Sequence, residues 1–200
     1  MTAPLRLFYI RHGETAWSLT GQHTSRADIP LTADGEAAAR ALRPVLEATR
    51  FTLVLTSPRQ RAQRTCDLAG LGANAEIEPD LAEWDYGDYE GRRSADIEID
   101  RPGWSLFRDG CPDGESPAQV SRRADRLISR LAGLQGDVAL FSHGHFGAVL
   151  GARWIELGVI EGRHFPLDPC SVSVLGFAAH HPEDRVIVRW NTAPGSPPAE

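Results

Sequence analysis

The chain has 200 residues, 42% of them hydrophobic, which is long enough to bury the core of one globular domain. Its formal net charge of −6 at pH 7 gives no general attraction to nucleic acid or to an anionic membrane. All 21 basic residues are arginine, which excludes a Schiff-base lysine and the lysine of a P-loop nucleotide site.

The apolar stretches and the cysteines indicate where in the cell the chain is expected to work. No apolar stretch approaches the roughly 18 residues needed to span a bilayer, and no signal-peptide pattern is present, so we expect a cytoplasmic protein. The cysteines Cys66, Cys111 and Cys170 are widely spaced and odd in number. We therefore expect reduced thiols rather than a disulfide or a metal knuckle.

Short apolar runs alternate with amphipathic segments along the chain. In chain order the patterns predict a strand over 5–10, a helix over 32–48, a strand over 52–57, helices over 57–70 and 116–134, a strand over 137–142, a helix over 147–158, and late strands over 171–178 and 185–190 that suit a hairpin. The first three strands are nearly continuous apolar runs, as expected of parallel strands covered on both faces. The pattern predicts an α/β sheet with crossover helices.

Two helix starts carry a capping signal. Ser57 and Ser116 are each followed by proline and, three residues on, by glutamine. This is a variant of the capping box with proline at the first helical position, and it predicts that helices begin there.

The domain organisation is simple. We expect one domain over 1–192, with the Gly/Asp/Arg-rich segment 84–115 as an insertion over the edge of the sheet where a ligand would bind, and a disordered tail over 193–200. No internal repeat is visible.

Polar residues follow each of the first three strands. In open α/β sheets, ligands bind beyond the carboxyl ends of the strands. The residues delivered there are Arg11, His12, Ser57, Arg59, Arg61, His143 and His145. Converging arginines present forked donors that suit a phosphate or carboxylate, so this edge is predicted to bind an anion.

A metal site is the alternative at "SHGH", residues 142–145. Arginines at the same edge would repel a cation, and no carboxylate stands at ligand-like spacing, so we expect no metal. A lone histidine is more often a hydrogen-bonded structural residue, and that is the interpretation for His145, His164, His180 and His181. His23 stays open.

Four motifs occur in a familiar order. "RHGET" follows the first strand, "TSPRQRAQRT" the second, "EWDYGDYEG" spans 83–91, and "SHGH" follows the third long apolar run. Together, from about Leu5 to about Phe177, they resemble the histidine phosphatase superfamily, with its phosphoglycerate mutase-like fold. That resemblance implies a three-layer α/β/α sandwich with a mostly parallel central sheet. The branch it is most similar to includes sedoheptulose-1,7-bisphosphatase, other sugar-phosphate phosphatases and acid phosphatases.

The resemblance implies roles for five residues. His12 would be the nucleophile that becomes a phosphohistidine, and neighbouring cations such as Arg11 favour its neutral, reactive form. Arg11, Arg59 and His143 match the phosphate-pocket residues, and Glu83 matches the general acid. The strand before His12 would hold the ring rigidly, and Gly13 would let the backbone pass close to a ligand.

Further residues are predicted to bind substrate. By the resemblance, Ser18, Gln22, His23 and Thr24 lie in the loop that lines the pocket, with Thr24 the strongest candidate. Gly144, between the two histidines of "SHGH", joins this group. Trp84 and Tyr86 are predicted to form an apolar wall beside the substrate, with core packing as the alternative. Arg64 is interpreted as an exposed helix arginine, whereas Arg61 fits either interpretation.

Two departures bear on the reaction. Phosphoglycerate mutases typically have Arg-His-Tyr after the general acid, whereas Trp84, Asp85 and Tyr86 stand here, which speaks against mutase activity. In the bisphosphatase branch an arginine usually follows the histidine pair and helps to hold a second phosphate, but "HFGAVL" has none. Arg92, Arg93 and Arg153 are possible substitutes, and a monophosphate substrate is favoured.

The sequence therefore predicts a metal-independent, cofactor-free phosphatase that hydrolyses small phosphomonoesters, sugar phosphates or related metabolites, through a phosphohistidine. Its expected partner is a small phosphorylated metabolite, and the family analogy suggests a homodimer. The alternatives are a cofactor-dependent mutase-type phosphotransfer enzyme and a non-catalytic phospholigand-binding module. The sequence does not identify the natural substrate.

Overall fold

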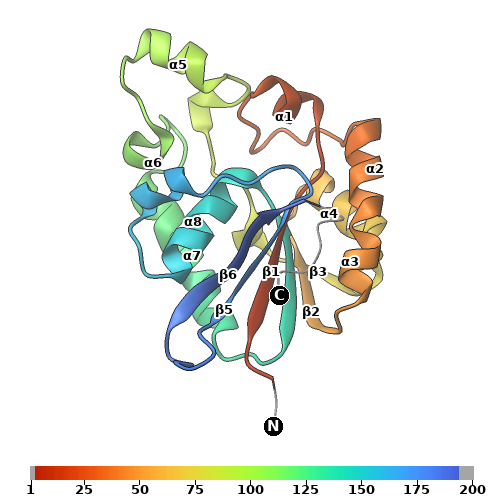
Figure 1. Cartoon of the computed structure of the whole chain (residues 1–200). Coiled ribbons are helices and arrows are strands. Elements are labelled where there is room, and N and C mark those ends of the chain that lie inside the picture. Colours follow the sequence, from red (N-terminus) through yellow and green to blue (C-terminus); the bar gives the residue numbers. More distant parts are fainter. Residues whose placement is uncertain (1–2, 194–200) are drawn as a thin grey trace.

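The computed structural model describes residues 3–193, which form a six-stranded mixed sheet between two layers of helices (Figure 1). The strands are β1 (Arg6–Arg11), β2 (Phe51–Thr56), β3 (Ala75–Ile77), β4 (Asp137–Ser142), β5 (Val172–Phe177) and β6 (Arg185–Thr192). Their order in the sheet is β3-β2-β4-β1-β5-β6. β1, β2, β3 and β4 are parallel, whereas β5 is antiparallel to β1 and to β6.

The helices cover both faces of this sheet. They are α1 (Ala16–Thr20), α2 (Ala33–Ala41), α3 (Arg43–Glu47), α4 (Gln60–Leu68), α5 (Ser94–Asp100), α6 (Leu106–Asp109), α7 (Pro117–Leu131) and α8 (Gly144–Trp154), with 3-10 turns η1 (Gly72–Asn74), η2 (Pro79–Leu81), η3 (Gly87–Tyr89) and η4 (Val159–His164). Figure 1 shows α2, α3 and α4 on one side of the sheet, α7 and α8 on the other, and α1, α5 and α6 above its carboxyl end. The predicted three-layer α/β/α class is confirmed.

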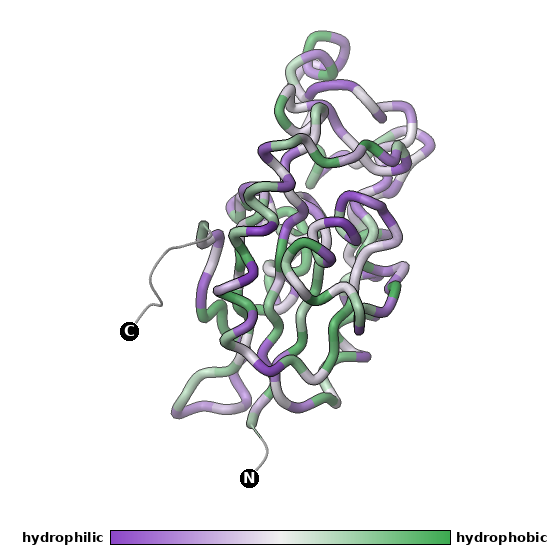
Figure 2. The backbone as a smooth tube through the Cα atoms, turned by 90° about the vertical axis from the view of Figure 1, so that its right-hand side faces the viewer, coloured by the Kyte–Doolittle hydropathy of each residue, from purple (hydrophilic) through white to green (hydrophobic). Residues whose placement is uncertain are grey.

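Side chains of β1 point alternately to the two faces of the sheet and contribute to the hydrophobic core on both faces. Leu7 and Tyr9 are buried in the cluster that contains α7 and α8, whereas Ile10 is buried with the side chains of α2, α3 and α4, and Phe8 packs against that second cluster. Because successive strand residues point to opposite faces, a continuous apolar run is buried on both sides. Figure 2 shows such hydrophobic runs through the body of the molecule, whereas the chain at the top alternates between hydrophilic and hydrophobic residues.

Several element predictions are confirmed. The three long apolar runs are β1, β2 and β4, and the late strands form the β5–β6 hairpin. Ser116 caps α7 as predicted: its hydroxyl accepts from the Gln119 amide, the Gln119 side chain accepts from the Ser116 amide, and proline opens the helix.

Other helix boundaries were wrong. The helix predicted over 32–48 is two, α2 and α3, because Pro44 cannot continue the hydrogen-bond ladder of α2. The capping box at Ser57 is absent: α4 begins at Gln60 after Arg59, and the Ser57 hydroxyl contacts His143 instead. The helix predicted over 147–158 runs from Gly144 to Trp154, and the short strand β3 was not predicted.

The segment 84–115 carries η3, α5 and α6 and stands over the carboxyl end of the parallel strands (Figure 1). Apart from Ala193, the predicted tail over 193–200 lies outside the described residues. Within residues 3–193, no helix has the length and apolar character that a bilayer crossing requires.

Candidate active site

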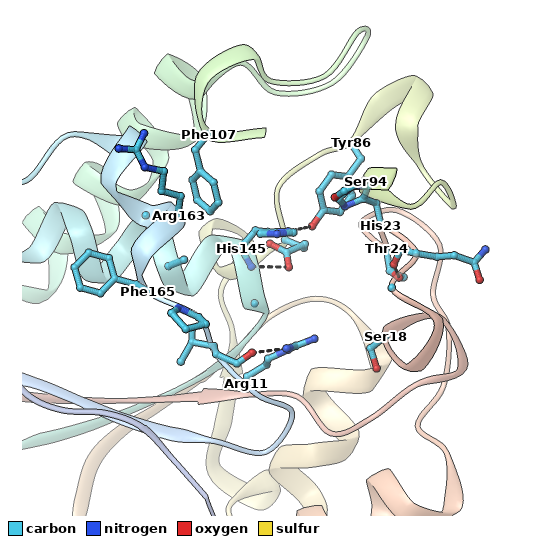
Figure 3. Close-up of a pocket in the computed structure, with 18 of the residues that line it drawn as sticks. Arg11, Ser18, His23, Thr24, Tyr86, Ser94, Phe107, His145, Arg163 and Phe165 are labelled. Atoms are coloured by element: carbon cyan, nitrogen blue, oxygen red, sulfur yellow. Dashed lines mark hydrogen bonds between the residues drawn. The ribbon is translucent and has the colours of Figure 1, made fainter. Parts of the chain in front are cut away.

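A cavity of about 430 Å³ lies beyond the carboxyl ends of β1 and β4 (Figure 3). Nine of the predicted site residues line it: Arg11, His12, Ser18, Gln22, His23, Thr24, Glu83, Tyr86 and Gly144. They come from β1, α1 and the loop after it, the 83–86 segment and the start of α8. The fold thus gathers residues more than 130 positions apart around one cavity.

His12 presents one ring nitrogen for chemistry. The ring is 5% exposed, and Nδ1 lies 2.7 Å from the Gly13 carbonyl oxygen. A carbonyl oxygen only accepts hydrogen bonds, so Nδ1 carries the proton and the lone pair is on Nε2. Burial, followed by the charges of Arg61 and Arg11, holds the pKa of His12 well below 6.5. The ring is therefore neutral at pH 7.

Arginines with unused donors lie near this ring, since Arg61 and Arg11 act on its charge and Arg59 lies in an adjacent cavity. The Nε atoms of Arg11, Arg59 and Arg61 are buried and have no hydrogen-bond partner among residues 3–193. Arg61 is fully buried, and its two Nη atoms each donate to a backbone carbonyl of the 24–27 loop at 3.0 Å. Arg59 lines a smaller adjacent cavity that shares Glu83 rather than the main one. Because buried donors are normally paired, these unpaired groups indicate an anion-binding site.

His143 lies beside His12 and is fully buried. The two rings are 5.1 Å apart between centroids. Nε2 of His143 lies 2.7 Å from the Ser57 hydroxyl, whereas Nδ1 is buried without a hydrogen-bond partner in the described chain. Burial and then the charge of Arg61 lower the pKa of His143 well below 6.5. A Ser57 hydroxyl that donates to Nε2 leaves the proton on Nδ1, the nitrogen without a partner, although His143 itself is not among the residues that line the cavity.

The Glu83 carboxylate is held at the N-terminus of α8. Its oxygens accept from the backbone amides of Phe146 at 2.7 Å, Trp84 at 2.8 Å and His145 at 3.1 Å. The first amides of a helix have no partner within the helix, so a carboxylate placed there satisfies them and meets the positive end of the helix dipole. This contact fixes a carboxyl group at the cavity wall.

The outer wall is aromatic and neutral. Tyr86 OH lies 2.6 Å from His145 Nδ1, and the ring of His23 packs 4.4 Å from that of Tyr86 (Figure 3). Burial lowers the pKa of both His23 and His145 to about 4, so neither is charged at pH 7. His145 was interpreted as structural, but it lines the cavity together with Ser94 and Phe107 from the 84–115 segment.

Of the two interpretations of Trp84, core packing is the one that the structure shows, and Trp84 does not line the cavity. Its ring is fully buried in the core, and its indole N–H donates to the Glu115 carbonyl at 2.8 Å. Gly13 also differs from expectation, because a Cβ there would meet the Gly35 carbonyl oxygen at 2.6 Å. Its small size therefore admits the start of α2 and not a ligand.

The remaining predicted residues divide between cavity and surface. Arg64 pairs with Glu36 on the surface, as predicted, whereas Arg61, which was left open, is buried beside His12. His164, His180 and His181 are exposed. Ser94, Phe107 and Phe165 also line the cavity and were missed. No motif marks them, since they belong to segments that tertiary packing folds over the strand ends.

The candidate arginines for a second phosphate are engaged elsewhere. Arg92 pairs with Asp100, Arg93 is bidentate to Asp96, and Arg153 pairs with Asp125. Arg163 lines the cavity, but Figure 3 shows its guanidinium directed away from Arg11.

Comparisons with known proteins identify the family of this chain. Residues 7–193 match the model of the histidine phosphatase superfamily (branch 1). The chain is 41% identical over 176 residues to an acid phosphatase of Mycobacterium tuberculosis, covering 86% of each chain. It is 36% identical over 187 residues to a sedoheptulose 1,7-bisphosphatase of Saccharomyces cerevisiae, covering 77% of this chain and 69% of the relative. The solved structure of the product of a Mycobacterium tuberculosis open reading frame superposes on this chain with a TM-score of 0.87 at 36% identity, covering 94% of this chain and 97% of the other.

Fold and cavity together define an α/β enzyme of the phosphoglycerate mutase-like class. The chain belongs to branch 1 of the histidine phosphatase superfamily and is a phosphoric monoester hydrolase.

Proposed function

We propose that this chain hydrolyses small monophosphate esters, sugar phosphates or related metabolites, through a phosphohistidine on His12 and without a metal ion or organic cofactor. The observation that carries the proposal is the neutral His12 ring beside Arg11 and Arg61, whose buried Nε groups, like that of Arg59 in the adjacent cavity, have no partner in residues 3–193. Such a site offers a nucleophile and fixed positive charge to one phosphoryl group, which is what phosphoryl transfer requires.

The reaction follows from the positions of these groups. The arginines and the His143 Nδ1–H hold the phosphoryl oxygens, and His12 Nε2 attacks phosphorus as the bond to the leaving oxygen breaks. A proton carried by the Glu83 carboxyl group passes to that oxygen, so the product leaves as an alcohol. In the second step Glu83 takes a proton from water, the water oxygen attacks phosphorus, and the N–P bond breaks to release inorganic phosphate and free His12.

Two features support the proposed independence from metal. One ring nitrogen of each candidate ligand is already engaged, because His143 Nε2 contacts Ser57 and His145 Nδ1 contacts Tyr86. Burial lowers the pKa of each of these histidines and the charge of Arg11 lowers it further, and the same positive charge would repel a divalent cation.

The neutral outer wall supports a substrate with a single phosphate. His23, Tyr86, Phe107 and His145 offer rings, hydroxyl and imidazole groups, which suit an uncharged polyhydroxylated or cyclic leaving group. The relatives named acid phosphatase and sedoheptulose 1,7-bisphosphatase support the phosphomonoester class.

The test is phosphate release from sugar monophosphates, matched bisphosphates and 3-phosphoglycerate, with a chelator present. We expect wild type to release phosphate without a bisphosphate primer, and His12→Ala to lose at least about 10³-fold in kcat/KM. His164→Ala, at an exposed histidine, is the matched control. Undiminished release by His12→Ala would refute the phosphohistidine, and strict dependence on a primer would instead identify a mutase.

A further inference from the structure

Arg123 of α7 is a buried arginine that the proposed reaction does not use. Arg123 is 8% exposed, and it lines the smaller cavity that also contains Arg59 and Glu83, not the 430 Å³ cavity. Nη1 donates to the carbonyl oxygens of Asp80 at 2.9 Å and Ala82 at 2.6 Å, and Nη2 donates to that of Glu83 at 3.2 Å. One guanidinium thus holds the main chain that leads into Glu83.

Glu115 fixes this guanidinium in place. Its carboxylate accepts from Arg123 Nε at 2.9 Å and from Nη2 at 2.6 Å, a bidentate pair with both side chains largely buried. The same carboxylate accepts from the Asp85 amide at 3.0 Å, and the Glu115 carbonyl accepts from the Trp84 indole at 2.8 Å. The segment on the other side of Glu83 is therefore held by the same pair.

The guanidinium also reaches the group that holds the Glu83 side chain. Its carbon lies 4.4 Å from the centroid of the Phe146 ring, and the Phe146 amide donates to Glu83 Oε1 at 2.7 Å. Arg123 therefore contacts the backbone of Glu83 and the first turn of α8 that positions its carboxyl group. A charged planar group stacked on an aromatic ring resists displacement better than a flexible ammonium would.

We propose that Arg123, held by Glu115, is a positioning residue that sets the Glu83 carboxyl at the leaving oxygen of the substrate. This rests on the proposed function, in which Glu83 gives its proton to that oxygen while the bond from oxygen to phosphorus breaks and the His12–phosphorus bond forms. Proton transfer requires the carboxyl group within hydrogen-bond reach of the leaving oxygen, so displacement of a few tenths of an ångström impairs this step before any other.

The experiment separates this role from a general loss of folding. Arg123→Met, Arg123→Lys and Glu115→Gln are compared with wild type on two substrates, an alkyl phosphate and para-nitrophenyl phosphate. An alkoxide is a poor leaving group and needs the proton from Glu83, whereas nitrophenolate departs with little help. Arg122→Met, at the exposed neighbouring position of the same helix, is the matched control.

We expect Arg123→Met to lower kcat/KM for the alkyl phosphate by about 10²-fold while para-nitrophenyl phosphate changes by less than about 5-fold. Arg123→Lys should recover part of the alkyl phosphate activity, and Arg122→Met should match wild type. Thermal unfolding identifies the variants that fold, and if Arg123→Met does not fold, Arg123→Lys and Glu115→Gln are read in its place.

Equal losses on both substrates in the folded variants, or no loss on either, would overturn the positioning role. Failure of the proposed function has a different signature: wild-type activity on para-nitrophenyl phosphate would then persist in His12→Ala. The two results are read from different variants and cannot be confused.

Discussion

Replacing His23 with phenylalanine should flatten the pH dependence of stability. His23 is buried against Tyr86 and Trp104, and its pKa in the folded protein is about 4, against an ordinary value of 6.5. Between these two values the unfolded chain binds a proton that the folded chain does not. Stability from this residue is therefore complete above pH 6.5 and is lost as the pH falls towards 4.

The size of the loss follows from the gap between the two pKa values. About 2.5 pH units at 1.36 kcal/mol per unit gives about 3 kcal/mol once the pH is below 4. On going from pH 7.5 to pH 5, His23 should lower the free energy of unfolding by about 2 kcal/mol of this total. Phenylalanine keeps a ring against Tyr86 but binds no proton, so this part of the pH dependence should vanish.

The assay is urea unfolding of wild type, His23→Phe and the exposed-site control His164→Phe at pH 7.5 and pH 5, in buffers without phosphate because a bound anion would stabilise the folded state. Any packing cost of the substitution cancels, because only the difference between the two pH values is compared. Wild type should lose about 2 kcal/mol more than His23→Phe over this interval, and His164→Phe should follow wild type. Parallel behaviour of wild type and His23→Phe would show that His23 does not stay neutral in the folded protein.

Two further predictions concern packing and the nucleophile. Gly35→Ala should lower the free energy of unfolding by more than about 2 kcal/mol, because the added Cβ would lie 2.2 Å from the Glu14 carbonyl oxygen. In the control Gly133→Ala the added Cβ meets no atom within 4 Å, so the free energy of unfolding should change by less than about 1 kcal/mol. Equal effects of the two substitutions in urea unfolding would contradict the packing argument. Burial and the charges of Arg61 and Arg11 hold the pKa of His12 well below 6.5. The value of kcat/KM, corrected for ionisation of the substrate phosphate, should therefore stay level between pH 7 and pH 6. A fall in kcat/KM on the acid side, centred near pH 6.5, would refute a neutral His12.

Much of the fold was readable because its signals are local. The apolar runs of β1, β2 and β4 are long enough to identify as strands, and the box at Ser116 is complete within four residues. The same box failed at Ser57 because a tertiary contact with His143 competes for the hydroxyl. β3 has only three residues and carries little pattern of its own.

The candidate site also divides into residues that local motifs identify and residues that only tertiary packing places. Arg11, His12, Glu83 and His143 stand in motifs, so their types and order point to phosphoryl chemistry without a structure. Trp84 stands in the same motif, yet it is fully buried in the core, since no local pattern says which side of a loop meets the cavity.

The sequence by itself determined the α/β class of the fold and pointed to His12 as the proposed nucleophile, since strand periodicity and a contiguous Arg-His-Gly motif are properties of neighbouring residues. Only the tertiary structure decided that Arg61 lies buried beside His12, that His145 faces the cavity and that Arg123 and Glu115 hold the backbone around Glu83. Those contacts join residues far apart in the chain. Their geometry depends on how α4, α7 and α8 pack around the strand ends, which no single stretch of sequence contains.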